Sequence, residues 1–251
     1  MKIDGHTFRF ILDTGGTNAL SPQAAQLLGI VGKGSIVSGG LGSGHVTKSY
    51  TKVKSLTLDD KVMFRDQTFA IEPMPKDKHQ EDGAIGSSLL YSFVMRIDYA
   101  AHELTLIRPA AFNADSAGTP LPIRVHYERP FVQASVGGVS GWFGIDTGFT
   151  STVLVFTPFA SKHDLYTRFH ASAAHSDVHG YNGKVHLRVA YNQEFDMGPM
   201  DGKLPLLLLS TATTGAATMQ DMAGFIGNEI LEHLTLMIDY ANHTMYIKPG
   251  G

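Results

Sequence analysis

Short apolar or alternating runs, separated by Gly, Asn and Asp, cover most of this chain. Alternation and enrichment in β-branched and aromatic residues over such short runs predict β-strands, with hairpins at 98–106 and 239–247. Helices are expected to be few and short. Residues 21–29 begin with Ser-Pro and end with Gly, which is the pattern of a capped helix, and two further short helices are expected at 87–93 and 228–234. The predicted strands lie at residues 7–15, 49–58, 95–107, 130–138, 183–191 and 234–247.

The two halves of the chain repeat one another. "FILDTGGTNAL" begins at Phe10 and "FGIDTGFTSTV" begins at Phe143, so the two Asp-Thr-Gly turns are 133 positions apart (146 − 13). Offsets that grow from 133 to 141 (226 − 85) along the chain are expected of a duplicated unit with small loop insertions. Three further motifs recur in the same order: Gly-rich stretches at 38–46 and 179–185, Ile-Gly at 85–86 and 226–227, and Ile-Asp-Tyr at 97–99 and 238–240.

The boundary between the two units is expected in a stretch that holds four prolines, residues 109–130. We therefore predict an N-terminal lobe at residues 1–115 and a C-terminal lobe at 116–251. A full strand precedes the second Asp-Thr-Gly strand, but only "MKIDG" precedes the first. The first strand of the N-terminal lobe is thus expected to be missing, so that another element replaces it or the chain is a piece of a longer one.

Composition narrows the class of protein. Of the 251 residues, 43% are hydrophobic and 17% are charged, which is typical of a folded globular chain. A net charge of −3 gives no electrostatic footprint for nucleic acid, and no apolar run is long enough to span a membrane. The absence of cysteine excludes disulfides, thiol catalysis and thiolate metal sites. No signal peptide is expected, so bacterial envelope and cytoplasm both remain open.

Two aspartates in matched turns indicate a carboxylate pair. Like charges about 3 Å apart share one proton, which separates their apparent pKa values, so that one acts as a general base and the other as an acid. Asp13 and Asp146 would form such a pair. Gly15 and Gly148 allow the backbone N–H groups to come close to the carboxylates. The adjacent Thr14 and Thr147 offer hydroxyls that could bond across the interface.

With these motifs the chain resembles the aspartic proteases of the pepsin and retropepsin group, most closely the bacterial retropepsin-like set. "FILDTGG" and "FGIDTGF" match the group's apolar-apolar-Asp-Thr-Gly motif, and Ala84–Gly86 and Phe225–Gly227 match its apolar-apolar-Gly motif. The resemblance implies an all-β, bilobal acid-protease fold. It makes Asp13 and Asp146 the catalytic dyad, supported by Thr14, Gly15, Thr147 and Gly148.

The function implied is that of an endopeptidase, which hydrolyses peptide bonds with a water molecule activated between the two carboxylates. Its partner is a peptide or protein substrate, and no cofactor or metal is expected. The chain would be a monomer, or a dimer formed through the incomplete N-terminal lobe.

The chain also departs from the pepsin pattern. Pepsins follow the motif with Ser or Thr, whose hydroxyl stabilises one ionised aspartate, but here Gly16 and Phe149 occupy these positions. We therefore expect a mildly acidic pH optimum. The flap tyrosine of pepsins has no clear counterpart. Candidate flap and substrate-binding residues are Gly39, Gly40 and Gly42, with Tyr181 in the second glycine-rich stretch.

Other interpretations remain open. The fold could serve a catalytically inactive peptide-binding module, and a carboxylate-pair glycosidase also needs two acids. The stretch that contains Gly39 could be a surface loop instead of a flap. Asp98 and Asp239 are expected to open hairpin turns. The histidines at 170, 175, 179 and 186 could ligate a metal, although a solvated loop is the simpler interpretation.

Overall fold

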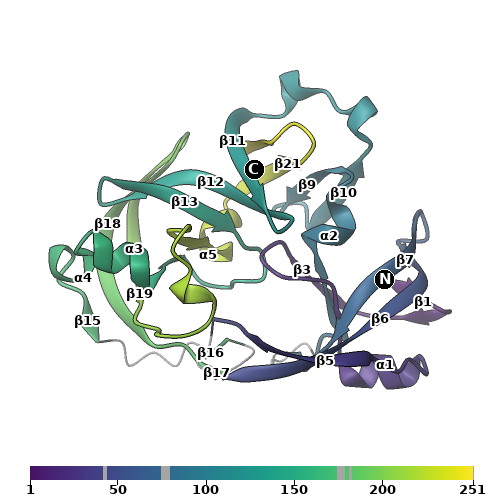
Figure 1. Cartoon of the computed structure of the whole chain (residues 1–251). Helices are drawn as coiled ribbons and strands as arrows, with labels where there is room; N and C mark the ends of the chain where they lie inside the picture. The colour runs from purple at the N-terminus through teal and green to yellow at the C-terminus, as the bar shows by residue number, and fades with distance from the viewer. Residues whose placement is uncertain (42–43, 75–79, 174–178, 181–182, 251) are drawn as a thin grey trace.

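The computed structural model describes residues 1–41, 44–74, 80–173, 179–180 and 183–250. The chain consists mostly of β-strands arranged in two lobes with a few short helices (Figure 1), which confirms the predicted all-β, bilobal fold. No helix of the described residues is long and apolar enough to span a membrane.

The N-terminal part of the chain forms an eight-stranded sheet in the order β2-β1-β6-β7-β4-β8-β3, with β5 paired to β6. Helix α1 (Pro22–Leu27) begins as predicted, because the Ser21 hydroxyl accepts a hydrogen bond from Ala24 N at 3.0 Å. A second short helix, α2 (Ser87–Leu90), follows β8. The strands of this sheet are β1 (Lys2–Ile3), β2 (His6–Thr7), β3 (Phe10–Asp13), β4 (Ala19–Leu20), β5 (Lys33–Gly39), β6 (His45–Leu58), β7 (Val62–Ile71) and β8 (Gly83–Gly86).

The remaining strands form a twelve-stranded sheet in the order β10-β9-β21-β22-β11-β12-β13-β20-β14-β19-β18-β15, and a small β16–β17 hairpin. The strands are β9 (Val94–Asp98), β10 (Glu103–Ile107), β11 (Thr119–His126), β12 (Arg129–Val136), β13 (Val139–Ile145), β14 (Val153–Val155), β15 (Ser172–Ala173), β16 (His179–Gly180), β17 (Gly183–Lys184), β18 (Leu187–Met197), β19 (Met200–Ser210), β20 (Gly224–Ile226), β21 (Leu234–Asp239) and β22 (Thr244–Pro249). The helices are α3 (Thr157–Lys162), α4 (Leu165–Arg168) and α5 (Asn228–Leu231), with 3-10 turns η1 (Pro109–Ala111), η2 (Ala114–Ser116) and η3 (Ala216–Thr218).

The repeat in the sequence is a repeat in strand pairing. Strand β3 runs parallel to β8 with Leu12 opposite Ile85, and β13 runs parallel to β20 with Ile145 opposite Ile226. A short strand then pairs antiparallel with the same partner in each half, β4 with β8 and β14 with β20. Each Asp-Thr-Gly turn therefore leaves the same three-strand arrangement.

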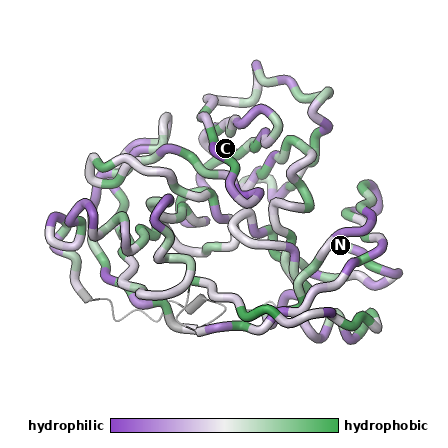
Figure 2. Tube along the Cα trace, in the orientation of Figure 1, coloured by the Kyte–Doolittle hydropathy of each residue, from purple (hydrophilic) through white to green (hydrophobic). Residues whose placement is uncertain are grey.

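The two halves are joined by one continuous sheet. Strand β9 of the first half pairs antiparallel with β21 of the second, with Leu236 opposite Ile97. One buried apolar cluster also includes residues of both halves, among them Leu90 and Met95 of the first and Ile226 and Leu236 of the second. Figure 2 shows hydrophobic and hydrophilic residues alternating along many of the strands around it. The lobe boundary at 115/116 stays a prediction.

The first strand of the N-terminal half is short. Strands β1 and β2 meet at a turn formed by Asp4 and Gly5, while β12 and β13 meet 133 positions later at Gly137 and Gly138. Strand β1 has two residues where β12 has eight, and it pairs with β6 through Lys2 and Ile3.

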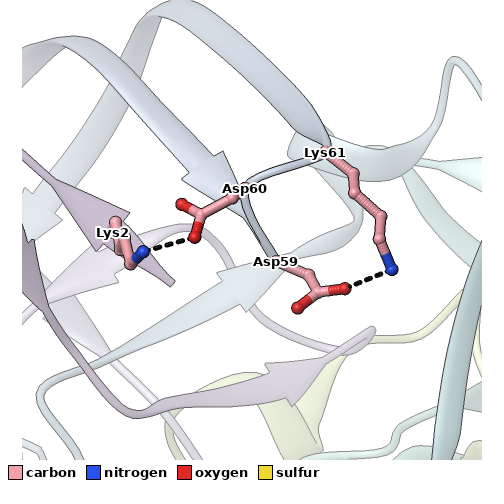
Figure 3. A network of polar contacts seen from close by, with 4 residues as sticks. All are labelled: Lys2, Asp59, Asp60 and Lys61. Atoms are coloured by element: carbon pink, nitrogen blue, oxygen red, sulfur yellow. Dashed lines mark hydrogen bonds and ion pairs between the residues drawn. The ribbon is translucent and has the colours of Figure 1, made fainter.

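Charged residues surround the exposed turn between β6 and β7 (Figure 3). Lys61 N donates to the Leu58 carbonyl at 3.0 Å, and the two residues between them, Asp59 and Asp60, have positive φ angles of 49° and 54°, as the central residues of a type I′ turn do. Lys2 of β1 pairs with Asp60, and Lys61 pairs with Asp59 at 2.7 Å. These pairs are solvent-exposed, so they contribute little to the stability of the fold.

Candidate active site

Two strands deliver the two aspartates to the same place. Asp13 is the last residue of β3 and lies opposite Gly86, and Asp146 directly follows β13, its N–H donating to the Ile226 carbonyl at 3.0 Å. Each aspartate is therefore held by the Ile-Gly motif of its own half.

The two carboxyl groups face each other across the junction of the halves and share a hydrogen bond. Each also lies against the glycine of the opposite turn. A Cβ added to Gly148 would lie 2.6 Å from Asp13 Cγ, and a Cβ added to Gly15 would overlap the Asp146 carboxyl. Glycine is thus required at both positions because the opposite carboxyl occupies the space of a side chain.

The two threonines join the two Asp-Thr-Gly turns by reciprocal hydrogen bonds. Thr14 N donates to Thr147 Oγ1, and Thr147 N donates to Thr14 Oγ1, each at 3.1 Å. The Thr14 hydroxyl in turn donates to the Ile145 carbonyl, and the Thr147 hydroxyl to the Leu12 carbonyl, each at 2.6 Å. Both threonines are buried, so this four-bond exchange fixes the distance between the two aspartates.

Burial raises the pKa of both aspartates above its ordinary value. The hydrogen bond from Asp146 opposes this rise for Asp13, whereas the negative charge of Asp13 raises the pKa of Asp146 further, well above its ordinary value. The pair is therefore expected to hold one shared proton over a wide pH range.

The donors to the dyad come from the backbone. Gly148 N donates to Asp146 Oδ1 at 3.0 Å, Gly16 N donates to the main-chain carbonyl of Asp13 at 3.2 Å, and the backbone N–H groups of Gly15 and Gly16 lower the pKa of Asp13. A Cβ at Gly16 would overlap Asp13 Oδ2, while Phe149 is buried in an apolar cluster. Gly16 and Phe149 therefore replace the hydroxyl-bearing residues of pepsins in different ways. Gly16 packs its backbone against Asp13, and Phe149 packs its side chain into the apolar cluster.

A positive charge also acts on the dyad. Arg129 begins β12, two residues before Phe131, and Phe131 lies opposite Gly144, two residues before Asp146. The charge of Arg129 lowers the pKa of both Asp13 and Asp146, and its buried Nε has no hydrogen-bond partner. Strand register is a tertiary property, and the sequence pattern alone did not indicate this position.

The Gly-rich stretch of the first half extends from a hairpin toward the second half. Gly39 ends β5, and the buried Gly40 accepts a hydrogen bond from Ala216 N at 3.1 Å. Leu41 packs against an apolar cluster of the second half. Gly42 and Tyr181, the other two candidate flap residues, lie outside the described residues.

The aspartates of the Ile-Asp-Tyr motif have a local structural role. Asp98 accepts a hydrogen bond from Ala101 N and Asp239 from Asn242 N, at 3.0 and 3.1 Å, so both open hairpin turns as expected. His175 lies outside the described residues, and the described ones contain no group of three or more metal-ligating side chains.

Comparison with known proteins found two similarities. The aspartyl protease family model matches residues 1–89, which include the first Asp-Thr-Gly turn and the first Ile-Gly motif. The crystal structure of an aspartic proteinase from Irpex lacteus superposes with a TM-score of 0.59 at 13% sequence identity, covering 98% of this chain and 91% of that one. The chain has the fold of a pepsin-like aspartic proteinase.

The family match covers the first half only, whereas the structural likeness to the aspartic proteinase covers both halves. No curated protein matches the chain in sequence. Together, the two matches support an aspartic protease of the pepsin and retropepsin type and a protease-type function.

Proposed function

We propose that the chain is an aspartic endopeptidase that hydrolyses peptide bonds with a water molecule activated between Asp13 and Asp146. The observation that carries the proposal is the pair of buried carboxyls that lie against the opposite turns and are held by reciprocal threonine bonds. A structural role alone would not require two buried carboxylates to face each other, because burial of unpaired acids destabilises the fold.

One proton shared between two carboxyl groups is suited to acid–base hydrolysis. Asp13, ionised, takes a proton from water, while Asp146, protonated, donates one to the carbonyl oxygen of the substrate. The resulting tetrahedral diol collapses when its nitrogen receives the proton held on Asp13 and Asp146 recovers a proton from a diol hydroxyl. The C–N bond breaks, a carboxylic acid and an amine are released, and the dyad returns to its starting protonation state.

Substrate would lie extended over the dyad, beneath the β5–β6 hairpin. Within the described residues strand β5 pairs with β6 alone, and an extended peptide can pair with the edge of such a strand by strand addition. Gly39, the last residue of β5, is suited to such pairing because no side chain blocks its backbone, whereas the carbonyl of the neighbouring Gly40 is already bonded to Ala216 N. Ile36 and Val37 are exposed on the same strand and would offer apolar contacts.

The test is cleavage of a pool of unstructured peptides from pH 3 to 7 by the parent protein, Asp13→Asn and Asp146→Asn. The exposed Asp201→Asn serves as the matched control. We expect cleavage by the parent and the control, with a mildly acidic optimum, and none by either dyad variant. Equal cleavage by all four proteins would contradict the proposed site. Peptide binding without cleavage by the parent would indicate an inactive peptide-binding module.

A further inference from the structure

A tyrosine of the second half is hydrogen-bonded to the catalytic turn of the first. The Tyr240 hydroxyl donates to Ser87 Oγ at 2.9 Å, and the Ser87 hydroxyl donates to the Thr14 carbonyl at 3.1 Å. Tyr240 and Ser87 are buried, with exposed fractions of 5% and 1%, so water does not compete for these bonds.

The mirror arrangement exists on the other side. The Tyr99 hydroxyl, from the first half, donates to Asn228 Oδ1 at 2.7 Å, and Asn228 Nδ2 donates to the Thr147 carbonyl at 2.7 Å. The two tyrosines are the last residues of the repeated Ile-Asp-Tyr motif, and Ser87 and Asn228 each follow an Ile-Gly motif. Equivalent positions thus build equivalent chains, although one uses a hydroxyl and the other an amide.

The crossing follows from the central sheet. Strands β9 and β21 are antiparallel, so the end of each lies beside the beginning of the other. Tyr99 directly follows β9 and therefore reaches the start of β21, which α5 and Asn228 precede. By the same register Tyr240 reaches the start of β9, which α2 and Ser87 precede.

Both chains continue into the catalytic carboxyls. The Thr147 carbonyl belongs to the same peptide group as Gly148 N–H, which donates to Asp146 Oδ1 at 3.0 Å. The Thr14 carbonyl belongs to the same peptide group as Gly15 N–H, and this N–H lowers the pKa of Asp13. Every donor in each series points toward its aspartate, and hydrogen bonds in series polarise one another, so the last N–H becomes a stronger donor.

We propose that Tyr99 and Tyr240 are positioning residues of the dyad, each strengthening the backbone donor to the aspartate of the opposite half through its Ser or Asn relay. The proposal rests on the proposed function for its catalytic consequence, and its geometry rests on the hydrogen bonds that begin at the two tyrosine hydroxyls. Neither tyrosine touches substrate in this role. Each acts on a carboxyl group through three intervening groups: a side chain, a peptide carbonyl and an N–H.

The tyrosines remain donors throughout the working pH range, because burial raises the pKa of both hydroxyls above its ordinary value. Other charged groups act on the same site. The charge of Arg129 lowers the pKa of both aspartates, and the negative charges of Glu232 and Asp146 raise the pKa of Tyr99. A conservative Tyr→Phe change leaves all of these charges in place and removes only the hydroxyl.

The direction of the expected pKa change follows from the hydrogen bonds. A backbone N–H stabilises the ionised form of the carboxyl it bonds, so a weaker donor raises the pKa of that carboxyl. Tyr240→Phe should therefore move the acidic limb of the pH–rate profile, set by Asp13, to higher pH. Tyr99→Phe should move the alkaline limb, set by Asp146, to higher pH.

The test compares Tyr240→Phe and Tyr99→Phe with Tyr191→Phe, a control on β18 whose side chain is 59% exposed. Two measurements are made: kcat and KM on a cleaved peptide from pH 3 to 7, and the ¹⁵N-amide resonances of Gly15 and Gly148. We expect each site variant to lose about fivefold in kcat, the usual worth of one hydrogen bond, at unchanged KM. The control should match the parent.

The amide resonances test whether each tyrosine affects the glycine of the opposite half. Tyr240→Phe should shift Gly15 more than Gly148, and Tyr99→Phe should shift Gly148 more than Gly15. In a Ser87→Ala background, Tyr240→Phe should have no further effect on kcat, because the relay is already broken.

The possible failures are distinguishable. Cleavage with unchanged kcat and pH limbs in both site variants would overturn the relay and leave the proposed function intact. Each tyrosine shifting only the glycine of its own half would also overturn it. Crossed amide shifts in a protein that cleaves nothing would support the positioning of the carboxyls and overturn the proposed function alone.

Discussion

Gly15 lies against the carboxyl group of Asp146, and Gly148 lies against that of Asp13, so each turn closes over the aspartate of the other half. The position of each carboxyl group therefore depends on its contact with the backbone of the opposite turn. A methyl group at either glycine has no free space to enter.

Gly15→Ala and Gly148→Ala should each abolish peptide cleavage, because the added Cβ must displace a catalytic carboxyl. Gly5→Ala is a control for the loss of a glycine that has no neighbouring atoms within 4 Å, although its positive φ adds strain of its own. Cleavage rates decide the matter, with circular dichroism to verify folding. Near-parental activity of Gly15→Ala would contradict the close packing of the two turns.

Thr14→Val should lower the free energy of unfolding by about 2–4 kcal/mol, because it leaves the Ile145 carbonyl and Thr147 N–H buried without partners. Thr14→Ser keeps the hydroxyl and should lose less than about 1 kcal/mol for one buried methyl group. Urea unfolding of the two variants measures the difference. Equal stability would show that the threonine exchange contributes only packing.

Arg129→Met should move both limbs of the pH–activity profile to higher pH. The positive charge lowers the pKa of both aspartates, so its removal lets both rise. Arg124→Met is the matched control, since Arg124 lies 4.1 Å over the Trp142 ring and does not act on the dyad. A profile that stays in place, or moves equally in the control, would exclude Arg129 as the source of the effect.

Asp146→Asn should make the folded state more stable at pH 7 than the parent. Burial and the Asp13 charge raise the pKa of Asp146 in the folded protein, so the folded state binds this proton more tightly than the unfolded chain. The parent is then favoured at low pH and loses stability as pH rises through the raised pKa. Denaturant unfolding at pH 4 and pH 7 should show this loss in the parent and a smaller one in the variant.

Lys48→Met should destabilise the fold by about 3 kcal/mol, because it removes the ion-pair partner of the buried Glu72, 2.6 Å away. Lys61→Met, which breaks the exposed pair with Asp59 in Figure 3, should leave the free energy of unfolding unchanged. Replacing Lys48 and Glu72 together with apolar residues should recover most of the loss. No recovery would mean that Lys48 acts through contacts other than this pair.

Most of the features that could be predicted from the sequence follow from the internal repeat. Two matched turns, two Ile-Gly motifs and two Ile-Asp-Tyr motifs indicate a duplicated β unit, and the strand pairing of both halves repeats accordingly. The helix at 21–29 was predictable because its cap is local: Ser21 bonds Ala24, three residues away. The threonine pair needed only the assumption that the two turns meet.

What escaped prediction depends on strand register. The aspartates of the Ile-Asp-Tyr motif bond their own turns, so their role was visible in the sequence. The adjacent tyrosines bond residues 129 and 153 positions away, in the other half, because β9 and β21 are antiparallel. Arg129 was missed for the same reason, since its position near the dyad depends on how β12 and β13 pair.

The two relays differ in one residue, Ser87 on one side and Asn228 on the other. A single substitution in this gene can therefore alter the surroundings of one aspartate while leaving the other untouched. An enzyme assembled from two identical subunits has no such freedom, because every mutation would appear on both sides of its axis at once. Duplication within one chain allows natural selection to assign separate duties to the two acids.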